Sequence, residues 1–239
     1  MKRTIILAIA ILTTIQVFGQ LSVGVRAGYG AYGVYFEPPS LNGNQVNLYE
    51  PNFGLVAIFN DKCNAGAQLE INYAVKGWRE KEKDCDTIRY KHEISYLEIP
   101  LMTHFEIGRG KFRVYGCFGP YFAVKQNEKT TNLNYNFIIE HDLYDMYNQK
   151  IRKLDFGNKV GLGFRINMNS RFSVLTDVRY DLQLAGGQNI FKKQPNGIQA
   201  SRISELSCSV GLIFNIRPQR TEEEKEYYIP KEGMNEDFY

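Results

Sequence analysis

Three histidines, His92, His104 and His141, are the side chains of this chain best suited to act as a catalytic base. A nucleophilic mechanism needs a hydroxyl or thiol within hydrogen-bond reach of such a base. Ser95 follows His92 by three residues, and on a β-strand this spacing places the two side chains on opposite faces. No nucleophile is paired with a base, so the sequence predicts no catalytic residue.

Acidic residues surround one of these histidines. His141 lies between Glu140 and Asp142, with Asp145 close by, and such a group could bind a divalent cation weakly. A solvated loop explains the same residues without a metal. We therefore expect no metal site here.

The four cysteines contain no pair with the spacing of metal ligands. They are Cys63, Cys85, Cys117 and Cys208. The strand pattern described below places Cys63 and Cys85 at opposite ends of a barrel, and Cys117 and Cys208 on strands far apart around it. We therefore expect no disulfide.

Glycines in the segment Gly28–Gly33 match the phosphate-binding pattern G-x-G-x-x-G. That pattern binds phosphate only where a helix follows it. Here a strand pattern continues to Phe36 and two prolines come next, so we expect no nucleotide and no other cofactor. The net charge of +3 and the lack of a basic run argue against a nucleic-acid partner.

The elements that must position these residues are strands. Residues 153–184 contain two long runs in which apolar and polar side chains alternate, joined by the turn Asn167–Ser170. Alternation with a period of two is typical of β-structure. Charges fall on the face that should be interior, which favours a barrel with its apolar face toward lipid.

Eight strands of this kind are predicted along the chain. Their expected ranges are Leu21–Phe36, Asn52–Asn60, Asn64–Trp78, Ile88–Ile107, Lys111–Lys125, Lys153–Met168, Arg171–Leu184 and Ser201–Arg217, the second being the shortest. Short turns alternate with long polar loops, as in transmembrane barrels with periplasmic turns and extracellular loops. The predicted fold class is all-β: an eight-stranded antiparallel up-and-down transmembrane barrel over residues 20–217.

Ten charged residues are predicted to point into this barrel. They are Arg26, Glu70, Glu98, Arg113, Lys159, Arg165, Asp177, Arg179, Asp181 and Glu205. Five are cationic and five anionic, and unpaired buried charges would be costly. We expect a lumen plugged by ion pairs; a proton or ion path along the same residues is the alternative.

Aromatic residues are expected to form girdles at the two ends of the barrel wall. The loop-end group is Tyr35, Phe36, Trp78, Tyr90, Phe156 and Tyr180. The turn-end group is Phe59, Phe105, Phe112, Phe172 and Phe214.

The two termini differ from the barrel in composition. Lys2 and Arg3 precede the apolar run Thr4–Phe18, which predicts a signal peptide over residues 1–19 with cleavage before Gln20. The run is short for a spanning helix, which disfavours a membrane anchor. Residues 218–239 are acidic and predict a flexible periplasmic tail.

Four motifs occur in order along the predicted strands: Tyr96–Leu101, Val114–Tyr121, Asp155–Gly157 with Gly161–Gly163, and Asp177–Tyr180. Together they resemble the PorT-like outer-membrane β-barrel family of Bacteroidetes. The resemblance spans roughly residues 20–217 and implies an eight-stranded barrel in the outer membrane. Most members of the family have no assigned activity, and the secretion and gliding role of one namesake does not transfer on barrel motifs alone.

Together these features predict a non-enzymatic integral barrel of the Gram-negative outer membrane, exported by its signal peptide. Its role would be structural or binding, within an envelope or secretion complex. Its expected partners are outer-membrane lipid and envelope proteins, which would bind the extracellular loops, chiefly Gln126–Arg152, or the tail. Two alternatives stay open: a barrel enzyme acting on lipid or peptide at the outer rim through His92 or His141, and a soluble lipocalin-like carrier with an apolar lumen.

Overall fold

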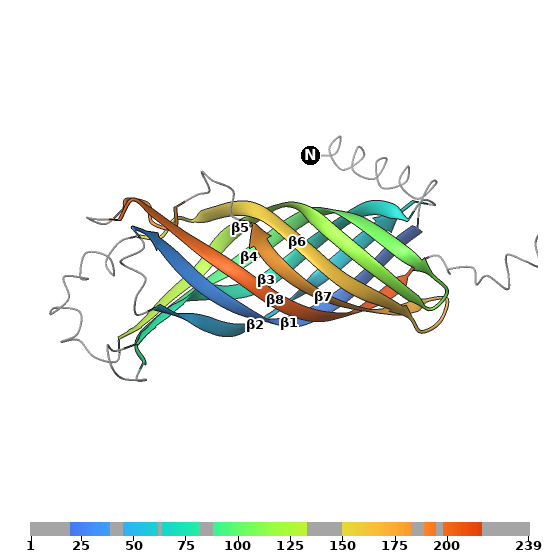
Figure 1. The fold of residues 1–239 in the computed structure, drawn as a ribbon, viewed down its shortest axis with the longest axis horizontal. Coiled ribbons are helices and arrows are strands. Elements are labelled where there is room, and N and C mark those ends of the chain that lie inside the picture. Colours follow the sequence, from blue (N-terminus) through green and yellow to red (C-terminus); the bar gives the residue numbers. More distant parts are fainter. Residues whose placement is uncertain are drawn as a thin grey trace, which may run out of the picture.

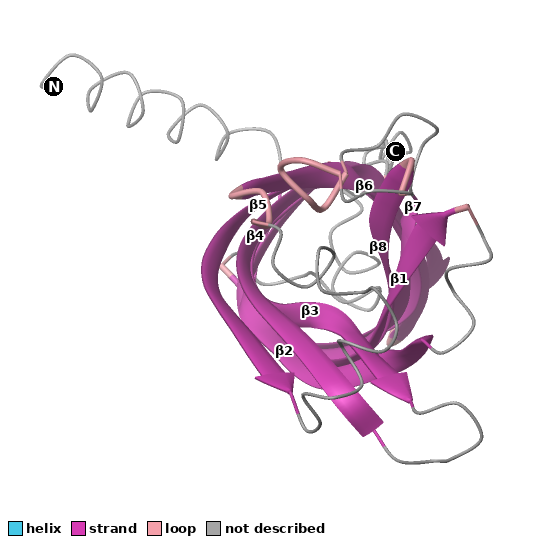
Figure 2. Cartoon of the chain, turned by 90° about the vertical axis from the view of Figure 1, so that its left-hand side faces the viewer, coloured by secondary structure: helices cyan, strands magenta, loops and turns pink. Residues whose placement is uncertain are grey.

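The chain folds into a closed barrel of eight antiparallel strands (Figures 1 and 2). The computed structural model describes residues 20–38, 45–61, 64–81, 88–132, 150–182, 189–194 and 198–216. The strands are β1 (Gln20–Glu37), β2 (Gln45–Asn60), β3 (Ala65–Lys81), β4 (Ile88–Arg109), β5 (Phe112–Asn132), β6 (Leu154–Asn167), β7 (Phe172–Leu182) and β8 (Ala200–Asn215). The predicted fold class is therefore confirmed.

Each strand pairs with its neighbours in the chain, and β1 closes the ring by pairing with β8. Val25 of β1, for example, faces Leu55 of β2 on one side and Leu212 of β8 on the other. Over the length that the strands share, every strand therefore has a partner on both sides, which removes the usual route to edge-to-edge aggregation.

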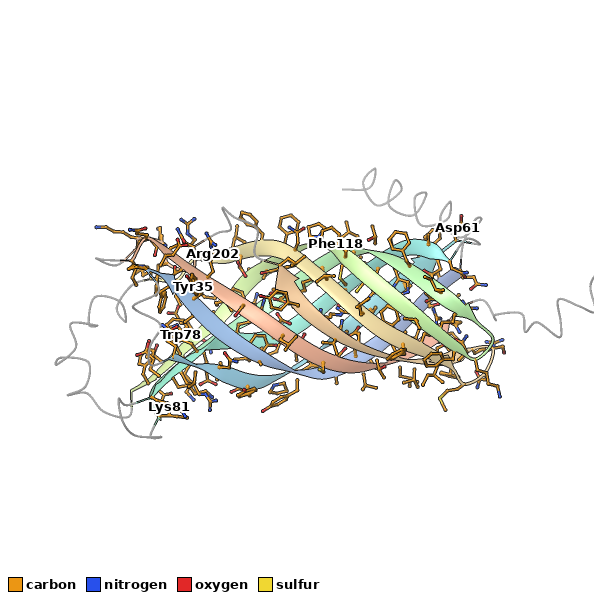
Figure 3. All side chains as sticks on the ribbon, viewed as in Figure 1. Tyr35, Asp61, Trp78, Lys81, Phe118 and Arg202 are labelled. Atoms are coloured by element: carbon orange, nitrogen blue, oxygen red, sulfur yellow. The ribbon has the colours of Figure 1, made fainter. Side chains whose placement is uncertain are left out.

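Local sequence explains the tight turns. Between β6 and β7, the Asn169 side-chain oxygen accepts hydrogen bonds from the backbone N–H groups of Arg171 and Phe172, at 2.9 and 2.7 Å. This is the turn-stabilising role that asparagine often has. The β2–β3, β4–β5 and β6–β7 connections all lie at one end of the barrel, which we call the turn end. Asp61 is at the turn end, and Trp78 and Lys81 are at the opposite loop end (Figure 3).

Two strands, β2 and β5, exceed the ranges that the sequence pattern predicted by far more than the others do. β2 begins at Gln45 rather than Asn52, so the prediction that it is the shortest strand was wrong; β7 is the shortest, with 11 residues. The β2–β3 register shifts between Asn47 and Asn52, and Pro51 interrupts the apolar pattern there. β5 continues to Asn132 across a register shift near Gln126, which the polar composition of this segment obscured.

Along each strand of the wall, side chains point alternately into the barrel and out of it. In β5 the odd-numbered residues from Tyr115 to Ala123, including Cys117 and Tyr121, are buried, whereas Phe118 and Phe122 are exposed. The alternation thus continues through residues 117–120, where the sequence pattern looked blurred. Figure 3 shows Phe118 on the outside of the wall. Among the described residues, no helix has the length and hydrophobicity needed to span a membrane.

Three expected members of the loop-end girdle are not on the outside. Phe36, Trp78 and Tyr90 are at most 1% exposed and lie in an interior apolar cluster, so their assignment to the girdle was wrong. Each is an even number of residues away from an inward charge on its own strand, so its side chain points to the same face. This alternation, and not nearness to a strand end, determines whether a side chain lies inside or outside the wall. The remaining members, which include Tyr35 and Phe105, are exposed or half-buried on the outer wall.

This interior cluster caps the barrel at the loop end. The ring of Phe191, which lies between β7 and β8, stacks 6.1 Å from the Phe36 ring and meets Trp78 edge-on. A bridge between Ile151 and Phe191 and a hydrogen bond from the Arg152 backbone N–H to the Ile190 carbonyl hold the segment in place. The loop end is therefore sealed by packed aromatic and aliphatic side chains.

Gly77 is a point where the wall requires glycine. Its φ is +150°, and a Cβ would lie 1.9 Å from the His92 carbonyl oxygen. We expect Gly77→Ala to lower the free energy of unfolding by about 3 kcal/mol or more, since strain and a backbone clash add. Urea unfolding in lipid vesicles, followed by the fluorescence of Trp78, measures the change.

Gly116→Ala is the matched control, because the nearest atom to its added Cβ is 3.6 Å away. Its effect should stay within about 1 kcal/mol. Equal losses in the two variants would show that glycine itself, and not the close approach at Gly77, stabilises the wall.

Candidate functional site in the barrel interior

All ten charged residues predicted to face the lumen do so in the structure, and they fall into three clusters along the barrel. Nine of them are buried, whereas the side chain of Arg113 is 21% exposed. We call the clusters the central cluster, the lysine cluster and the turn-end cluster.

The central cluster consists of Arg26, Glu70, Asp177 and Arg179, contributed by β1, β3 and β7. Each guanidinium contacts both carboxylates: Arg26 lies 2.8 Å from Glu70 and 3.1 Å from Asp177, and Arg179 lies 2.7 Å from each. Two cations and two anions form a closed ring, so no charge in it lacks a partner.

Neutral side chains complete the hydrogen bonding of these carboxylates. Tyr115 and Ser209 donate their hydroxyl hydrogens to Asp177, at 2.7 and 2.5 Å. The Asn72 amide donates to Glu70 at 2.7 Å. Buried ion pairs are stable only when such additional bonds satisfy the remaining lone pairs, and this ring meets that requirement.

The lysine cluster lies nearer the loop end. It consists of Lys76, Glu98, Lys159, Asp181 and Glu205, from five different strands. Each ammonium lies within 3.4 Å of all three carboxylates, and every side chain is at most 4% exposed. The cluster thus cross-links β3, β4, β6, β7 and β8 across the lumen.

Tyr121 of β5 completes the lysine cluster. Its ring lies 4.9 Å from Lys76 Nζ and 5.1 Å from Lys159 Nζ, within the range of cation–π attraction. The aromatic face separates the two ammonium groups from the apolar cap beyond it.

The turn-end cluster is built around Glu106. Arg165 lies 2.8 Å and Arg113 3.1 Å from its carboxylate, and the Nε2 atom of His104 lies 2.9 Å away. The side chain of Gln68 connects this cluster to the central one, because it contacts His104 at 2.7 Å and donates to Glu70.

Two charged members of the network were missed from the sequence: Lys76 and Glu106. Both have the parity of charges already placed in the lumen, Glu70 on β3 and Glu98 on β4. Extending the alternation by a few residues along each strand would have found them. With both included, the three clusters contain six cations and six anions.

The clusters leave little empty space between them. A cavity of about 10 Å³ separates the central cluster from the lysine cluster, with Asn52, Asn72 and Ser207 in its wall. This is close to the volume that a single water molecule needs. The described interior is therefore filled by side chains, and its charges contradict the apolar lumen that a lipocalin-like carrier requires.

The remaining candidate residues do not bring Ser95 to a histidine, because Ser95 points outward whereas His92 lies inside the barrel, stacked 4.6 Å from Trp78. The hydroxyl groups beside His92 are those of Tyr90 and Thr130, at 2.9 and 3.0 Å from Nδ1, and the Glu128 carboxylate lies 3.4 Å from Nε2. His104 belongs to the turn-end cluster. Cys117 and Cys208 are free cysteines, the first buried and the second exposed.

Several expectations lie outside the described residues. They concern the signal peptide over 1–19, the tail over 218–239, Cys63, Cys85, and the group of Glu140, His141, Asp142 and Asp145.

Glu70 is the residue whose loss should harm the network most. Glu70→Gln leaves Arg26 and Arg179 facing one carboxylate, and removing one partner of a buried pair costs about 3–5 kcal/mol. We expect that loss in urea unfolding, whereas Asp61→Asn at the exposed turn should change stability by less than about 0.5 kcal/mol.

A double-mutant cycle separates the charge effect from lost packing. The combined Glu70→Gln and Arg179→Met variant should lose less stability than the two single variants together, with a coupling of about 1–3 kcal/mol. Additive losses would contradict a mutually dependent ring.

Comparison with known proteins gives the family of this fold. The family model described as "Outer membrane protein beta-barrel domain" matches residues 14–186. No curated protein matches this chain.

Solved structures of outer-membrane proteins are also similar. OprG of Pseudomonas aeruginosa matches with a TM-score of 0.50 and 14% identity, over 84% of this chain and 97% of OprG. Ail of Yersinia pestis, solved with a heparin analogue, matches with a TM-score of 0.39 and 12% identity, over 83% of this chain and all of Ail. The N-terminal domain of Pseudomonas aeruginosa OprF gives 0.37 and 11%, over 82% and 99%. At 14% identity, the likeness to OprG shows the fold alone. Because the family model spans most of the chain, this protein belongs to the outer membrane protein beta-barrel domain family.

Proposed function

We propose that this protein is a non-enzymatic outer-membrane barrel whose interior is a permanent plug and whose role, structural or binding, lies outside the lumen. The observation that carries this proposal is the lysine cluster, in which six ion pairs of 2.5–3.4 Å cross the lumen between strands. A solute could pass only if these contacts separated, and the apolar cap closes the loop end beyond them.

The same contacts argue against the alternative of a proton or ion path. A path needs sites that are weak enough to release what they bind. The carboxylates of the central and lysine clusters are instead held by cations and hydrogen-bond donors of the wall itself. We assign the network a structural role: it fixes strand positions around an eight-stranded ring.

We further propose that the protein is one of the PorT-like barrels of Bacteroidetes. Residues of the resembling motifs supply the interior: Tyr96 is in the apolar cap, Glu98 in the lysine cluster, and Asp177 and Arg179 in the central cluster. Envelope proteins would be its partners, at the long loops or the tail.

Conductance in planar bilayers tests the plug. We expect the wild-type protein to form no large steady pore, and Phe191→Ala to remain closed as well, because the ionic clusters lie below the cap. A large steady conductance in the wild-type protein would contradict the proposal. A pore that opens only in the Phe191→Ala variant would assign the plug to the cap instead of the ion pairs.

Labelling in intact cells tests the proposed orientation, with the loop end at the cell surface and the turn end in the periplasm. Lys192 and Lys111 are exposed at the loop and turn ends. In a chain whose native cysteines are replaced by serine, a membrane-impermeant maleimide should label Lys192→Cys on intact cells and Lys111→Cys only after lysis. The reverse pattern would show the opposite orientation.

A further inference from the structure

The lysine cluster contains more negative than positive charge. Its carboxylates are those of Glu98, Asp181 and Glu205, and its ammonium groups are those of Lys76 and Lys159. Three carboxylates against two ammonium groups leave a net charge of −1 when every group is ionised. All five side chains are at most 4% exposed, so solvent does not screen this excess.

The charged side chains that lie nearest to the cluster do not supply the missing positive charge. Arg179 comes two residues before Asp181 on β7, but both it and Arg26 are bound to the two carboxylates of the central cluster. Asp155 of β6 accepts a hydrogen bond from the Tyr121 hydroxyl group at 3.3 Å, so it adds a further carboxyl group to this part of the barrel. The excess of negative charge in the lysine cluster is therefore not balanced from the neighbouring strands.

The titratable groups that surround Asp181 come from strands all around the lumen. The tyrosines among them are neutral at pH 7, which leaves only the two lysines as cations in direct contact. The full set is Tyr32 of β1, Lys76 of β3, Tyr96 and Glu98 of β4, Tyr121 of β5, Asp155 and Lys159 of β6, Arg179 of β7 and Glu205 of β8.

Asp181 has the weakest contacts of the three carboxyl groups. Its Oδ2 atom accepts a hydrogen bond from Lys76 at 3.0 Å. Its Oδ1 atom lies 3.4 Å from Lys159 and accepts no hydrogen bond from any described residue. One oxygen of Asp181 is thus available to carry a proton.

The other two carboxylates are held more closely. Glu205 lies within 3.0 Å of both ammonium groups and also accepts a hydrogen bond from the Ser207 hydroxyl group at 2.9 Å. The two oxygens of Glu98 lie 2.5 and 2.8 Å from the two ammonium groups. Asp181 is therefore the member of the cluster whose ionised form is stabilised least.

A buried carboxyl group without enough cationic partners avoids the cost of its charge by keeping its proton. We propose that the lysine cluster holds one proton at neutral pH, on the Oδ1 atom of Asp181, and that the cluster is electrically neutral in this form. The proton is held and not conducted, because the adjacent cavity of about 10 Å³ has room for about one water molecule. This inference is independent of the proposed plug, since the lumen would be closed to solutes with or without the proton.

Infrared spectroscopy of the full chain in lipid vesicles at pH 7 tests the proposal. A protonated carboxyl group has a carbonyl stretching band that is separate from the bands of carboxylates and amides. We expect such a band in the wild-type protein, and we expect it to shift when the side-chain carboxyl carbon of aspartate is isotopically labelled. The band should be lost in Asp181→Asn. No labelled band in the wild type, or an unchanged band in this variant, would overturn the proposal.

Glu205→Gln tests the charge balance on which the proposal depends. This variant leaves two carboxyl groups for two ammonium groups, so Asp181 should ionise and the labelled band should disappear although Asp181 is still present. Asp61→Asn, at the exposed turn, is the matched control and should leave the band unchanged. A band that persists in Glu205→Gln would overturn the proposal, because the proton would then not depend on the excess charge.

Unfolding in urea gives a second readout, because asparagine is a neutral substitute for a protonated aspartate. Asp181→Asn should keep the urea midpoint of the wild type at pH 7, whereas Glu70→Gln should lower it because Glu70 is needed as an anion. An equal loss in the two variants would show that Asp181 is also needed as an anion, and would overturn the proposal.

Counting protons on unfolding completes the test. An exposed aspartate is ionised at pH 7, so unfolding should release about one more proton from the wild type than from Asp181→Asn. Equal release would contradict the proposal. Heat-modifiable gel mobility reports whether each variant is folded; if Asp181→Asn does not fold, the labelled wild-type band and its loss in Glu205→Gln still decide the question.

Discussion

The structure depends on the pairing of opposite charges inside a closed wall. A barrel of eight strands has an interior that side chains must fill, and in this chain many of those side chains are charged. Each charge removed from water costs several kcal/mol unless partners surround it. Glu70 shows how the cost is offset: two arginines from β1 and β7 contact its carboxylate, and amides from its own strand complete the hydrogen bonds.

Counted with every carboxylate ionised, the three clusters are neutral when taken together, but two of them carry a net charge when taken alone. The lysine cluster has three carboxylates for two ammonium groups, whereas the turn-end cluster has two guanidinium groups for one carboxylate, Glu106. The neutral central cluster lies between them, and Gln68 joins it to the turn-end cluster. The excess negative charge of the lysine cluster and the excess positive charge of the turn-end cluster are equal, so the three clusters together carry no net charge.

The alternation of residues was enough to predict the strand number, the antiparallel order and the inward face. It was not enough to predict which charges meet, because that depends on the stagger of strands around the ring; Lys76 and Asp181 are 3.0 Å apart but come from β3 and β7. The girdle prediction failed at Phe36, Trp78 and Tyr90 for a related reason. The wall extends beyond the apolar belt, and its loop-end interior must be sealed as well.

The ion pairs of the interior restrict which residues can change to bind a new ligand or partner. Each member of the central cluster has two charged partners, so a substitution there leaves a buried charge without compensation. The outer wall has no such restriction: Arg79 of β3, for example, contacts the Asn47 carbonyl oxygen and the Tyr49 ring, and neither contact depends on the charges of the lumen. Residues on the outer wall and in the long loops can therefore change with the ligand or partner while the ionic interior keeps the barrel intact.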